Sequence, residues 1–222
     1  MLIFLDTGNI DEIKKWIDRG VIDGITTNQK LLLKEKTINF GDFKKAVLKI
    51  CRLKKYPVSV ELTGHESVAK MIKEAKNFAS WHKNVVVKVP MITDGMGLNV
   101  IKKLKDLKIK TNATLMVSFE QMLLAIKAGA SYASIFFNRA KEAGYDPIEI
   151  IKRSRDFIDS GRYNCQIISG SIRSTRDVGD SFAAGSDIVT IPARIIEQML
   201  AEKRTQETVI EFDAAWEEFK KR

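Results

Sequence analysis

The sequence is poor in cysteine and proline and has no long apolar run. It contains two cysteines and four prolines among 222 residues. Cys51 and Cys165 fall in a predicted helix and a predicted strand without the spacing of metal ligands, so we expect core or near-core thiols and no metal site. No stretch approaches the ~18 apolar residues of a membrane span, and residues 1–6 lack the basic region and the length of a signal peptide. We therefore expect a cytoplasmic protein without a membrane partner.

Composition and charge narrow the class of protein further. Hydrophobic residues make up 45% of the chain and charged residues 29%, which is ordinary for a soluble globular enzyme and excludes a disordered or collagenous chain. The formal net charge is +9, but the basic residues are spread along predicted helix faces, without a dense tract or interleaved aromatic residues. We expect a modest attraction for anionic metabolites and no nucleic-acid partner.

Apolar strand-like segments alternate with amphipathic helical segments from one end of the chain to the other. No linker rich in Pro, Gly or Ser, no repeat and no low-complexity segment divides them. The eight predicted strands are 2–5, 24–27, 58–62, 85–89, 112–116, 132–137, 166–169 and 188–191. The helices that follow them are 9–19, one within 40–54, 66–82, 95–107, 119–128, 147–158, 175–184 and 193–201. Asn9 is the expected N-cap of the first helix, and Gly129 and Gly185 are expected to end the fifth and the seventh.

Eight strands separated by helices predict right-handed parallel crossovers and a closed barrel rather than an open sheet. The predicted fold class is α/β, a single TIM (β/α)8 barrel over residues 1–222 with an additional C-terminal helix. That helix, at 206–220, is apolar at roughly helical spacing. We expect it to pack on the barrel or on a neighbouring subunit.

A single lysine, Lys88, stands inside the β-branched run 85–90. A run of this kind is typical of a fully buried strand, and burial disfavours the ammonium form of a lysine. A neutral amine there can attack a carbonyl and form a Schiff base. The alternative is a lysine that reaches solvent at the strand end or pairs with a carboxylate.

Other polar residues also fall at the predicted carboxyl ends of strands, where the active sites of such barrels lie. Period-two alternation allows Asp6, Lys88 and Ser134 to face the barrel interior. The full set comprises Asp6, Thr26, Thr27, Asn28, Glu61, Lys88, Thr114, Ser134, Arg139, Ser171 and Arg173. Their convergence on one barrel mouth favours a functional site.

Several of these residues also have a purely structural explanation. Asp6 can belong to a turn or a helix cap, and Asn28 can cap the next helix. Thr114 is an ordinary strand residue, residues 171–175 can be a loop with a helix cap, and Arg139 can be a solvated loop charge.

The set nevertheless matches the needs of one reaction. An iminium formed on Lys88 from a ketose would weaken the neighbouring carbon–carbon bond without a metal or a cofactor. Asp6 would act as acid and base at the sugar hydroxyl, and Glu61 with Thr114 would position a water. A terminal phosphate would be held by a clamp made of Arg139, Ser171 and Arg173.

The chain resembles the small transaldolase family, including the related fructose-6-phosphate aldolases, nearly from end to end. The resemblance rests on the order and spacing of several short motifs rather than on any one of them. These are Phe4-Leu5-Asp6-Thr7, Gly24-Ile25-Thr26-Thr27-Asn28, Val85-Val86-Val87-Lys88-Val89-Pro90, Lys127-Ala128-Gly129-Ala130, Asn138-Arg139, Ser171-Ile172-Arg173 and Asp187-Ile188-Val189-Thr190-Ile191-Pro192.

The resemblance implies a TIM barrel and a role for each matching position. Lys88 matches the Schiff-base lysine on the fourth strand, Asp6 the catalytic acid and base, and Glu61 and Thr114 the pair that binds the catalytic water. The remaining matches concern substrate binding: Asn28 and Ser134 for the dihydroxyacetone part, and Arg139, Ser171 and Arg173 for the phosphate. The resemblance also implies a homo-oligomer, a pentamer or a decamer, whose C-terminal helix packs against a neighbour.

Particular residues favour the transferase branch over the aldolase branch. The aldolases carry glutamine and tyrosine where this sequence has Glu61 and Phe136, and Phe136 lacks the phenolic hydroxyl. Arg173 is likewise the transaldolase choice where the aldolase has lysine. The chain also departs from the family at two places. The family normally has a proline after Thr-Thr-Asn, where this chain has Gln29 followed by Lys30, and a proline beside Ser134, where this chain has Ile135.

The first hypothesis is therefore a transaldolase of the pentose phosphate pathway. It would move a dihydroxyacetone unit from sedoheptulose 7-phosphate or fructose 6-phosphate to glyceraldehyde 3-phosphate or erythrose 4-phosphate. The second is an aldolase that releases free dihydroxyacetone, or a transferase that acts on a modified sugar. The third, from another class, is a non-catalytic barrel that binds a sugar phosphate or an anionic polymer.

Overall fold

The computed structural model describes residues 1–35 and 39–222, and its strands form a closed parallel barrel. Each strand pairs with its neighbours in chain order, and β1 closes the barrel by pairing with β8. The strands are β1 (Leu2–Asp6), β2 (Gly24–Thr26), β3 (Val58–Glu61), β4 (Val85–Pro90), β5 (Thr111–Met116), β6 (Tyr132–Phe136), β7 (Gln166–Gly170) and β8 (Ile188–Ile191). The TIM barrel predicted from the sequence is confirmed.

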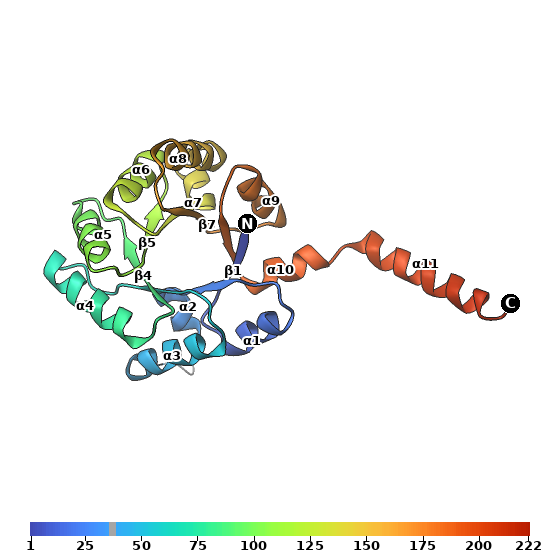
Figure 1. Ribbon diagram of the computed structural model, residues 1–222. Helices are drawn as coiled ribbons and strands as arrows, with labels where there is room; N and C mark the ends of the chain where they lie inside the picture. The colour runs from blue at the N-terminus through green and yellow to red at the C-terminus, as the bar shows by residue number, and fades with distance from the viewer. Residues whose placement is uncertain (36–38) are drawn as a thin grey trace.

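Helices surround the barrel on its outside (Figure 1). They are α1 (Ile10–Asp18), α2 (Gln29–Lys34), α3 (Phe43–Leu53), α4 (Val68–Trp81), α5 (Met96–Asp106), α6 (Phe119–Ala128), α7 (Phe137–Glu142), α8 (Pro147–Gly161), α9 (Thr175–Ala183), α10 (Ala193–Leu200) and α11 (Lys203–Phe219), with a 3-10 turn η1 (Phe40–Asp42) before α3. The sequence did not predict α2 or α7. Phe137, expected to end the sixth strand, instead begins α7.

The helix ends follow the expected capping residues. The Asn9 side chain caps α1 by accepting hydrogen bonds from the backbone N–H groups of Asp11 and Glu12. Gly129 ends α6 with φ 97°, a left-handed conformation that glycine adopts without steric cost. Gly185 has φ 106° and follows the end of α9.

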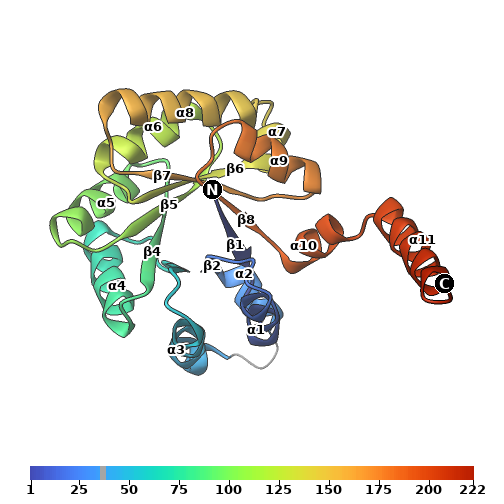
Figure 2. The same ribbon diagram turned by 45° about the vertical axis from the view of Figure 1, so that its right-hand side comes forward.

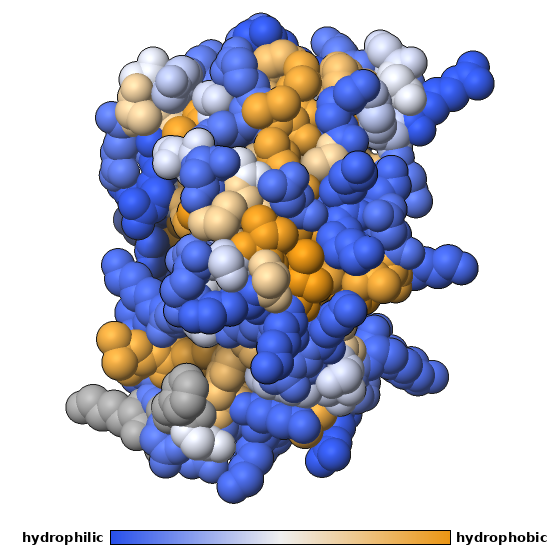
Figure 3. Space-filling view, turned by 90° about the vertical axis from the view of Figure 1, so that its left-hand side faces the viewer, coloured by the Kyte–Doolittle hydropathy of each residue, from blue (hydrophilic) through white to orange (hydrophobic). Residues whose placement is uncertain are grey.

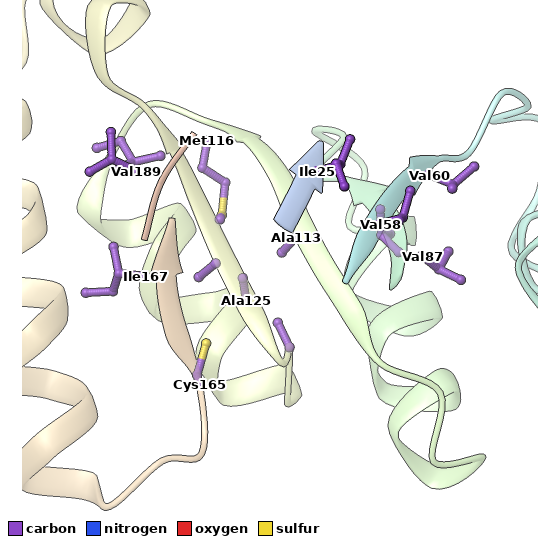
Figure 4. Close-up of a cluster of buried hydrophobic side chains, with 14 of the residues drawn as sticks. Ile25, Val58, Val60, Val87, Ala113, Met116, Ala125, Cys165, Ile167 and Val189 are labelled. Atoms are coloured by element: carbon purple, nitrogen blue, oxygen red, sulfur yellow. The ribbon is translucent and has the colours of Figure 1, made fainter. Parts of the chain in front are cut away.

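Most of the core lies between the barrel and its helices. Outward-facing strand residues such as Ile25, Val87 and Ile167 pack there with the inner faces of the helices (Figure 4). Cys51 and Cys165 are both free and buried, as expected, and burial raises the pKa of their thiols to about 11 and about 12.

A second, smaller cluster fills the barrel interior. It consists of Phe4, Val86, Tyr132, Ile168 and Ile188, all on the inward-facing side of their strands. A Cβ on Gly24 would lie 2.5 Å from the Phe4 ring, so only glycine leaves room for that ring. Because this apolar layer closes the barrel below, the polar residues farther along the strands face only the mouth.

The last helix leaves the barrel. Both ribbon views show α11 pointing away from the remaining helices, beyond α10 (Figures 1 and 2). The opposite side of the molecule, on which α4 and α5 lie, is largely hydrophilic with apolar patches between the charged side chains (Figure 3). Within the described residues, no helix is both long enough and apolar enough to cross a membrane.

Candidate active site

A small cavity opens at the carboxyl ends of the strands. Its volume is about 30 Å³, which is close to the space of a single water molecule. Its walls come from seven of the eight strands and from the residues that directly follow them. They are formed by Asp6, Thr26, Asn28, Lys88, Asn112, Thr114, Ser134, Phe136, Gly170, Ser171 and Thr190.

Lys88 is buried at the floor of this mouth. Only 5% of the residue is exposed, so the alternative of a lysine that reaches solvent is wrong, whereas the alternative of a lysine paired with a carboxylate is seen in its contact with Glu61. Its Nζ lies 3.2 Å from Glu61 Oε2 and donates to the Thr27 carbonyl oxygen at 3.3 Å. The register pairs Glu61 with Lys88 on neighbouring strands, which explains the contact. Lys88 therefore has a carboxylate within reach of its proton.

Asp6 lies on the same cavity and is held by a chain of hydroxyl groups. Thr26 Oγ1 donates to Asp6 Oδ1 at 2.7 Å, and the Thr190 hydroxyl lies 2.6 Å from Thr26 Oγ1. Burial raises the pKa of the Asp6 carboxyl above its ordinary value, although the charge of Lys88 and the Thr26 hydrogen bond oppose this rise. A carboxyl group with a raised pKa is suited to hold and release a proton.

Thr114 has a buried hydroxyl group that makes no hydrogen bond to the described residues. Its Oγ1 has no hydrogen-bond partner in the part of the chain that the structure describes, although the residue is completely buried and lines the cavity. The strand changes register directly beyond it, where Leu115 has φ 66°. An unpartnered buried hydroxyl beside a cavity of this size fits a bound water.

Comparison with known proteins shows which proteins this chain is similar to. The family model described as Transaldolase/Fructose-6-phosphate aldolase matches residues 3–222. A "Probable transaldolase" of Maridesulfovibrio salexigens is 41% identical over 221 residues, covering 100% of each chain. Proteins with the same description from Desulfosudis oleivorans and Streptococcus equi subsp. equi are each 38% identical over 221 residues, with the same coverage.

The chain belongs to the transaldolase/fructose-6-phosphate aldolase family. It is therefore an enzyme, as the sequence predicted. Within residues 1–35 and 39–222, no group of three or more His, Cys, Asp or Glu side chains is placed to hold a metal ion.

The two residues expected at the dihydroxyacetone end both reach the cavity of this family member. Asn28 also caps α2, because its side chain accepts from the Leu31 N–H at 3.0 Å, so the structural and the functional explanation hold together. The Ser134 hydroxyl donates to Asn112 Oδ1 at 2.6 Å. Gln29 Nε2 donates to the Leu62 carbonyl oxygen at 2.8 Å, which ties the start of α2 to the end of β3.

The three residues expected to bind phosphate lie at the rim. Ser171 lines the cavity and has φ 59°, whereas Arg139 and Arg173 are exposed. Arg173 Nη1 lies 2.5 Å from Glu142 Oε1, at the end of α7. Arg173 and Arg139 both lower the pKa of the Glu142 carboxyl, with the hydrogen bond from Arg173 as the largest cause. The two arginines thus lie around one carboxylate.

The sequence did not single out several polar residues that belong to the mouth. Asn112 and Thr190 line the cavity, and Ser59 accepts a hydrogen bond from Asn112 Nδ2 at 3.2 Å. Asn112 shares the inward face of β5 with Thr114, so period-two alternation counted from Thr114 would have indicated Asn112. Asn138 and Asp177 hold the rim from below through contacts between distant elements, for which the sequence contains no periodic signal.

Proposed function

We propose that the protein is a transaldolase that transfers a dihydroxyacetone unit between sugar phosphates by a Schiff-base mechanism. The proposed donors are sedoheptulose 7-phosphate and fructose 6-phosphate, and the acceptors are glyceraldehyde 3-phosphate and erythrose 4-phosphate, as in the pentose phosphate pathway. The observation that carries the proposal is the buried Lys88, whose Nζ lies 3.2 Å from Glu61 in a mouth shared with Asp6.

The first steps need a neutral amine and a water. Lys88 loses its proton to Glu61, directly or through a water, and its nitrogen attacks the ketose carbonyl carbon to give a carbinolamine. Protonation of the carbinolamine hydroxyl then releases water and leaves an iminium. The buried hydroxyl of Thr114 and the carboxylate of Glu61 are suited to hold that water.

Bond cleavage needs a base at the sugar hydroxyl. The Asp6 carboxylate takes the proton of the C4 hydroxyl while the C3–C4 bond breaks, which releases an aldose and leaves an enamine on Lys88. The electron pair of the broken bond forms the C2–C3 double bond of the enamine, and the π pair of the iminium moves to its nitrogen. An acceptor aldehyde reverses the step, with Asp6 returning the proton, and water then hydrolyses the new iminium.

The ends of the substrate are proposed to bind on different elements. Asn28 and Ser134 bind the dihydroxyacetone hydroxyls inside the mouth, beside Phe136. A cavity of about 30 Å³ is too small for a complete sugar phosphate, so the remainder must lie over the rim. There Ser171 and the exposed guanidinium groups of Arg139 and Arg173 form a phosphate clamp, which here means these three residues.

The proposal is tested by trapping the iminium with borohydride in the presence of fructose 6-phosphate. We expect one sugar adduct per chain, located on Lys88 by peptide mass measurement, and no adduct in Lys88→Met. Lys110→Met, at an exposed lysine, is the matched control and should trap normally. An adduct on another lysine, or none, would contradict the Schiff-base mechanism.

Product analysis separates the transferase from the aldolase alternative. A transferase turns over slowly on fructose 6-phosphate alone and quickly once glyceraldehyde 3-phosphate is added. Phe136 and Glu61, in place of a tyrosine and a glutamine, support the transferase. Steady release of free dihydroxyacetone without an acceptor would show the aldolase instead.

We also propose that the chain is a homo-oligomer, a ring of five or ten copies assembled through α11. Five large apolar residues of this helix are about half or more exposed: Val209, Ile210, Phe212, Trp216 and Phe219. Because α11 points away from its own barrel, it is placed to cover a second copy (Figure 2). The cytoplasmic location and the lack of a nucleic-acid partner stay predictions.

A further inference from the structure

Beneath the phosphate clamp lies a buried carboxylate to which the proposed mechanism gives no role. Asp177, in the first turn of α9, is only 5% exposed. Both of its oxygens accept hydrogen bonds from the two segments that carry the clamp arginines. Its Oδ2 accepts from Asn138 Nδ2 at 2.7 Å and from the backbone N–H groups of Arg173 and Ser174 at 3.1 Å each, and its Oδ1 accepts from Lys141 Nζ at 3.2 Å.

Helix capping accounts for only part of this arrangement. In the capping box at the start of α9, the Asp177 side chain accepts from the Ser174 N–H. A capping box needs only that bond and the reciprocal one, in which the Asp177 N–H donates to Ser174 Oγ at 3.2 Å. The contacts with Asn138, Lys141 and the Arg173 N–H are additional, and they join α9 to α7 and to the loop that follows β7.

Asn138 completes the connection. Its Nδ2 also donates to the Ser171 carbonyl oxygen at 2.9 Å, so both hydrogens of the amide are used. Asn138 immediately precedes Arg139 in α7, and Ser171 is the clamp residue with φ 59°. One amide therefore fixes the segment of Arg139 and the backbone of Ser171 at the same time.

The carboxylate is held in its charged form. Burial opposes its ionisation, but the hydrogen bonds from Asn138 and the Arg173 N–H, with Lys141, outweigh burial and lower the pKa of Asp177 to about 2. The Arg173 N–H points inward to this anion, while its side chain remains 51% exposed at the rim. The anion thus fixes the backbone and leaves the guanidinium at the rim, where it pairs with Glu142.

We propose that Asp177 and Asn138 are positioning residues that join the segments of Arg139, Ser171 and Arg173 into a single phosphate-binding unit. The inference rests on the proposed function, because it assumes that this unit receives the phosphate of a sugar phosphate. Neither residue is among those that line the cavity of the described chain. Their loss should therefore abolish the preference for phosphorylated ketoses without abolishing Schiff-base formation on Lys88.

The test compares fructose 6-phosphate with unphosphorylated fructose as donors for the full chain. We expect Asp177→Asn to lower kcat/KM for fructose 6-phosphate about 10–100-fold, mainly through KM, and to change kcat/KM for fructose by no more than about twofold. Asn138→Ala, which keeps the buried anion, should shift the preference in the same direction. It also decides the question if Asp177→Asn does not fold.

The matched control is Asp180→Asn in the same helix. Among the described residues, the Asp180 side chain pairs only with the exposed Arg176, at 3.6 Å, so this variant should leave kcat/KM for both donors unchanged. Double-mutant cycles add a second readout. In the wild-type background, the effects of Arg139→Ala and Arg173→Ala on kcat/KM for fructose 6-phosphate should be strongly non-additive. In the Asn138→Ala background, the same two effects should be nearly additive.

The possible outcomes separate this inference from the proposed function. If no iminium can be trapped on Lys88 with either sugar, the proposed function fails. If Lys88 is trapped but the folded variants keep the wild-type preference for fructose 6-phosphate, only the positioning role is overturned. A wild type that does not prefer the phosphorylated donor also overturns it. An equal loss with both donors would indicate a merely structural role.

Discussion

Three ionisable side chains at the barrel mouth have different environments, and these environments suit different roles. Lys88 and Glu61 lie 3.2 Å apart, so they can exchange a proton. Asp6 instead accepts from a hydroxyl, and burial raises the pKa of its carboxyl. A raised pKa suits a carboxyl group to hold and release a proton. These contacts support the proposed roles of Asp6 as acid and base and of Glu61 as the partner of the amine.

The first prediction concerns the cost of keeping Asp6 charged. Because its pKa is raised in the folded state, the native protein holds this proton to a higher pH than the unfolded chain does. The stability that Asp6 contributes therefore falls as pH rises from the unfolded pKa through the folded one. We expect Asp6→Asn to raise the free energy of unfolding at pH 7 and to leave it unchanged well below pH 4. Urea titrations over this pH range measure the difference.

The same variant should lose activity by about 10²–10⁴-fold, since a general acid–base contributes on that order. A stability gain of equal size at acid and neutral pH would show that the charge of Asp6 is not its cause. Unaltered activity would remove Asp6 from the reaction.

The second prediction uses the unpartnered hydroxyl of Thr114. Thr114→Val keeps the shape but removes the hydroxyl, so we expect the free energy of unfolding to stay equal or to rise by up to about 1 kcal/mol. Formation of the iminium should slow by about tenfold or more, because the water loses a ligand. Stopped-flow or quenched trapping measures that step. Thr111→Val, at a buried threonine of the same strand on the opposite face, is the control and should not slow it.

At the scale of elements, the sequence predicted the regular strands but not the short helices or the irregular part of β5. The barrel follows from alternation and order, and β4 and β8 begin at the residues predicted for them. By contrast, α2 and α7 have six residues each, too few to show a helical period. Leu115 in β5 has φ 66°, a left-handed backbone conformation that leucine rarely adopts, so the residue type gave no sign of it. The contacts of Asp177 join elements that are far apart in sequence, and only the fold reveals them.

The third prediction concerns the packing of β1 against β2 inside the barrel. Gly24→Ala would place a Cβ 2.5 Å from the Phe4 ring. The ring cannot easily move away, because it is packed in the apolar layer that fills the barrel interior. Overpacking of this kind costs about 1–3 kcal/mol. Gly179→Ala in α9 is the contrasting variant, because no described atom outside the adjacent residues and the backbone of its own helix lies within 4 Å of the added Cβ. It should stabilise the protein by about 0.5–1 kcal/mol. Urea denaturation of both variants would contradict this account if Gly24→Ala proved the more stable.

At the scale of the whole molecule, the barrel is complete but its last helix is not covered. Val209, Phe212, Trp216 and Phe219 recur at spacings of three and four residues, so they form one stripe along α11. The rings of Trp216 and Phe219 stack with centroids 5.6 Å apart. Full burial of such a side chain contributes about 1.5–3 kcal/mol of stability, and a monomer with an exposed α11 does not gain it. A stripe of this size on a projecting helix favours association with another copy.

The last prediction tests this association directly. Light scattering after size-exclusion chromatography should give the wild type a mass of five or ten times the 25.1 kDa chain. Phe212→Ser combined with Trp216→Ser should shift the mass towards that of one chain, because both substitutions remove apolar area from the stripe. Glu218→Gln is the control and should keep the assembly, because the Glu218 side chain pairs with Arg222 just beyond the end of the helix. Since the barrel buries its own core without α11, the circular dichroism of the double variant should remain that of a folded barrel. A monomeric wild type would contradict the proposed assembly, and a ring that survives the double substitution would show that another surface holds the copies together.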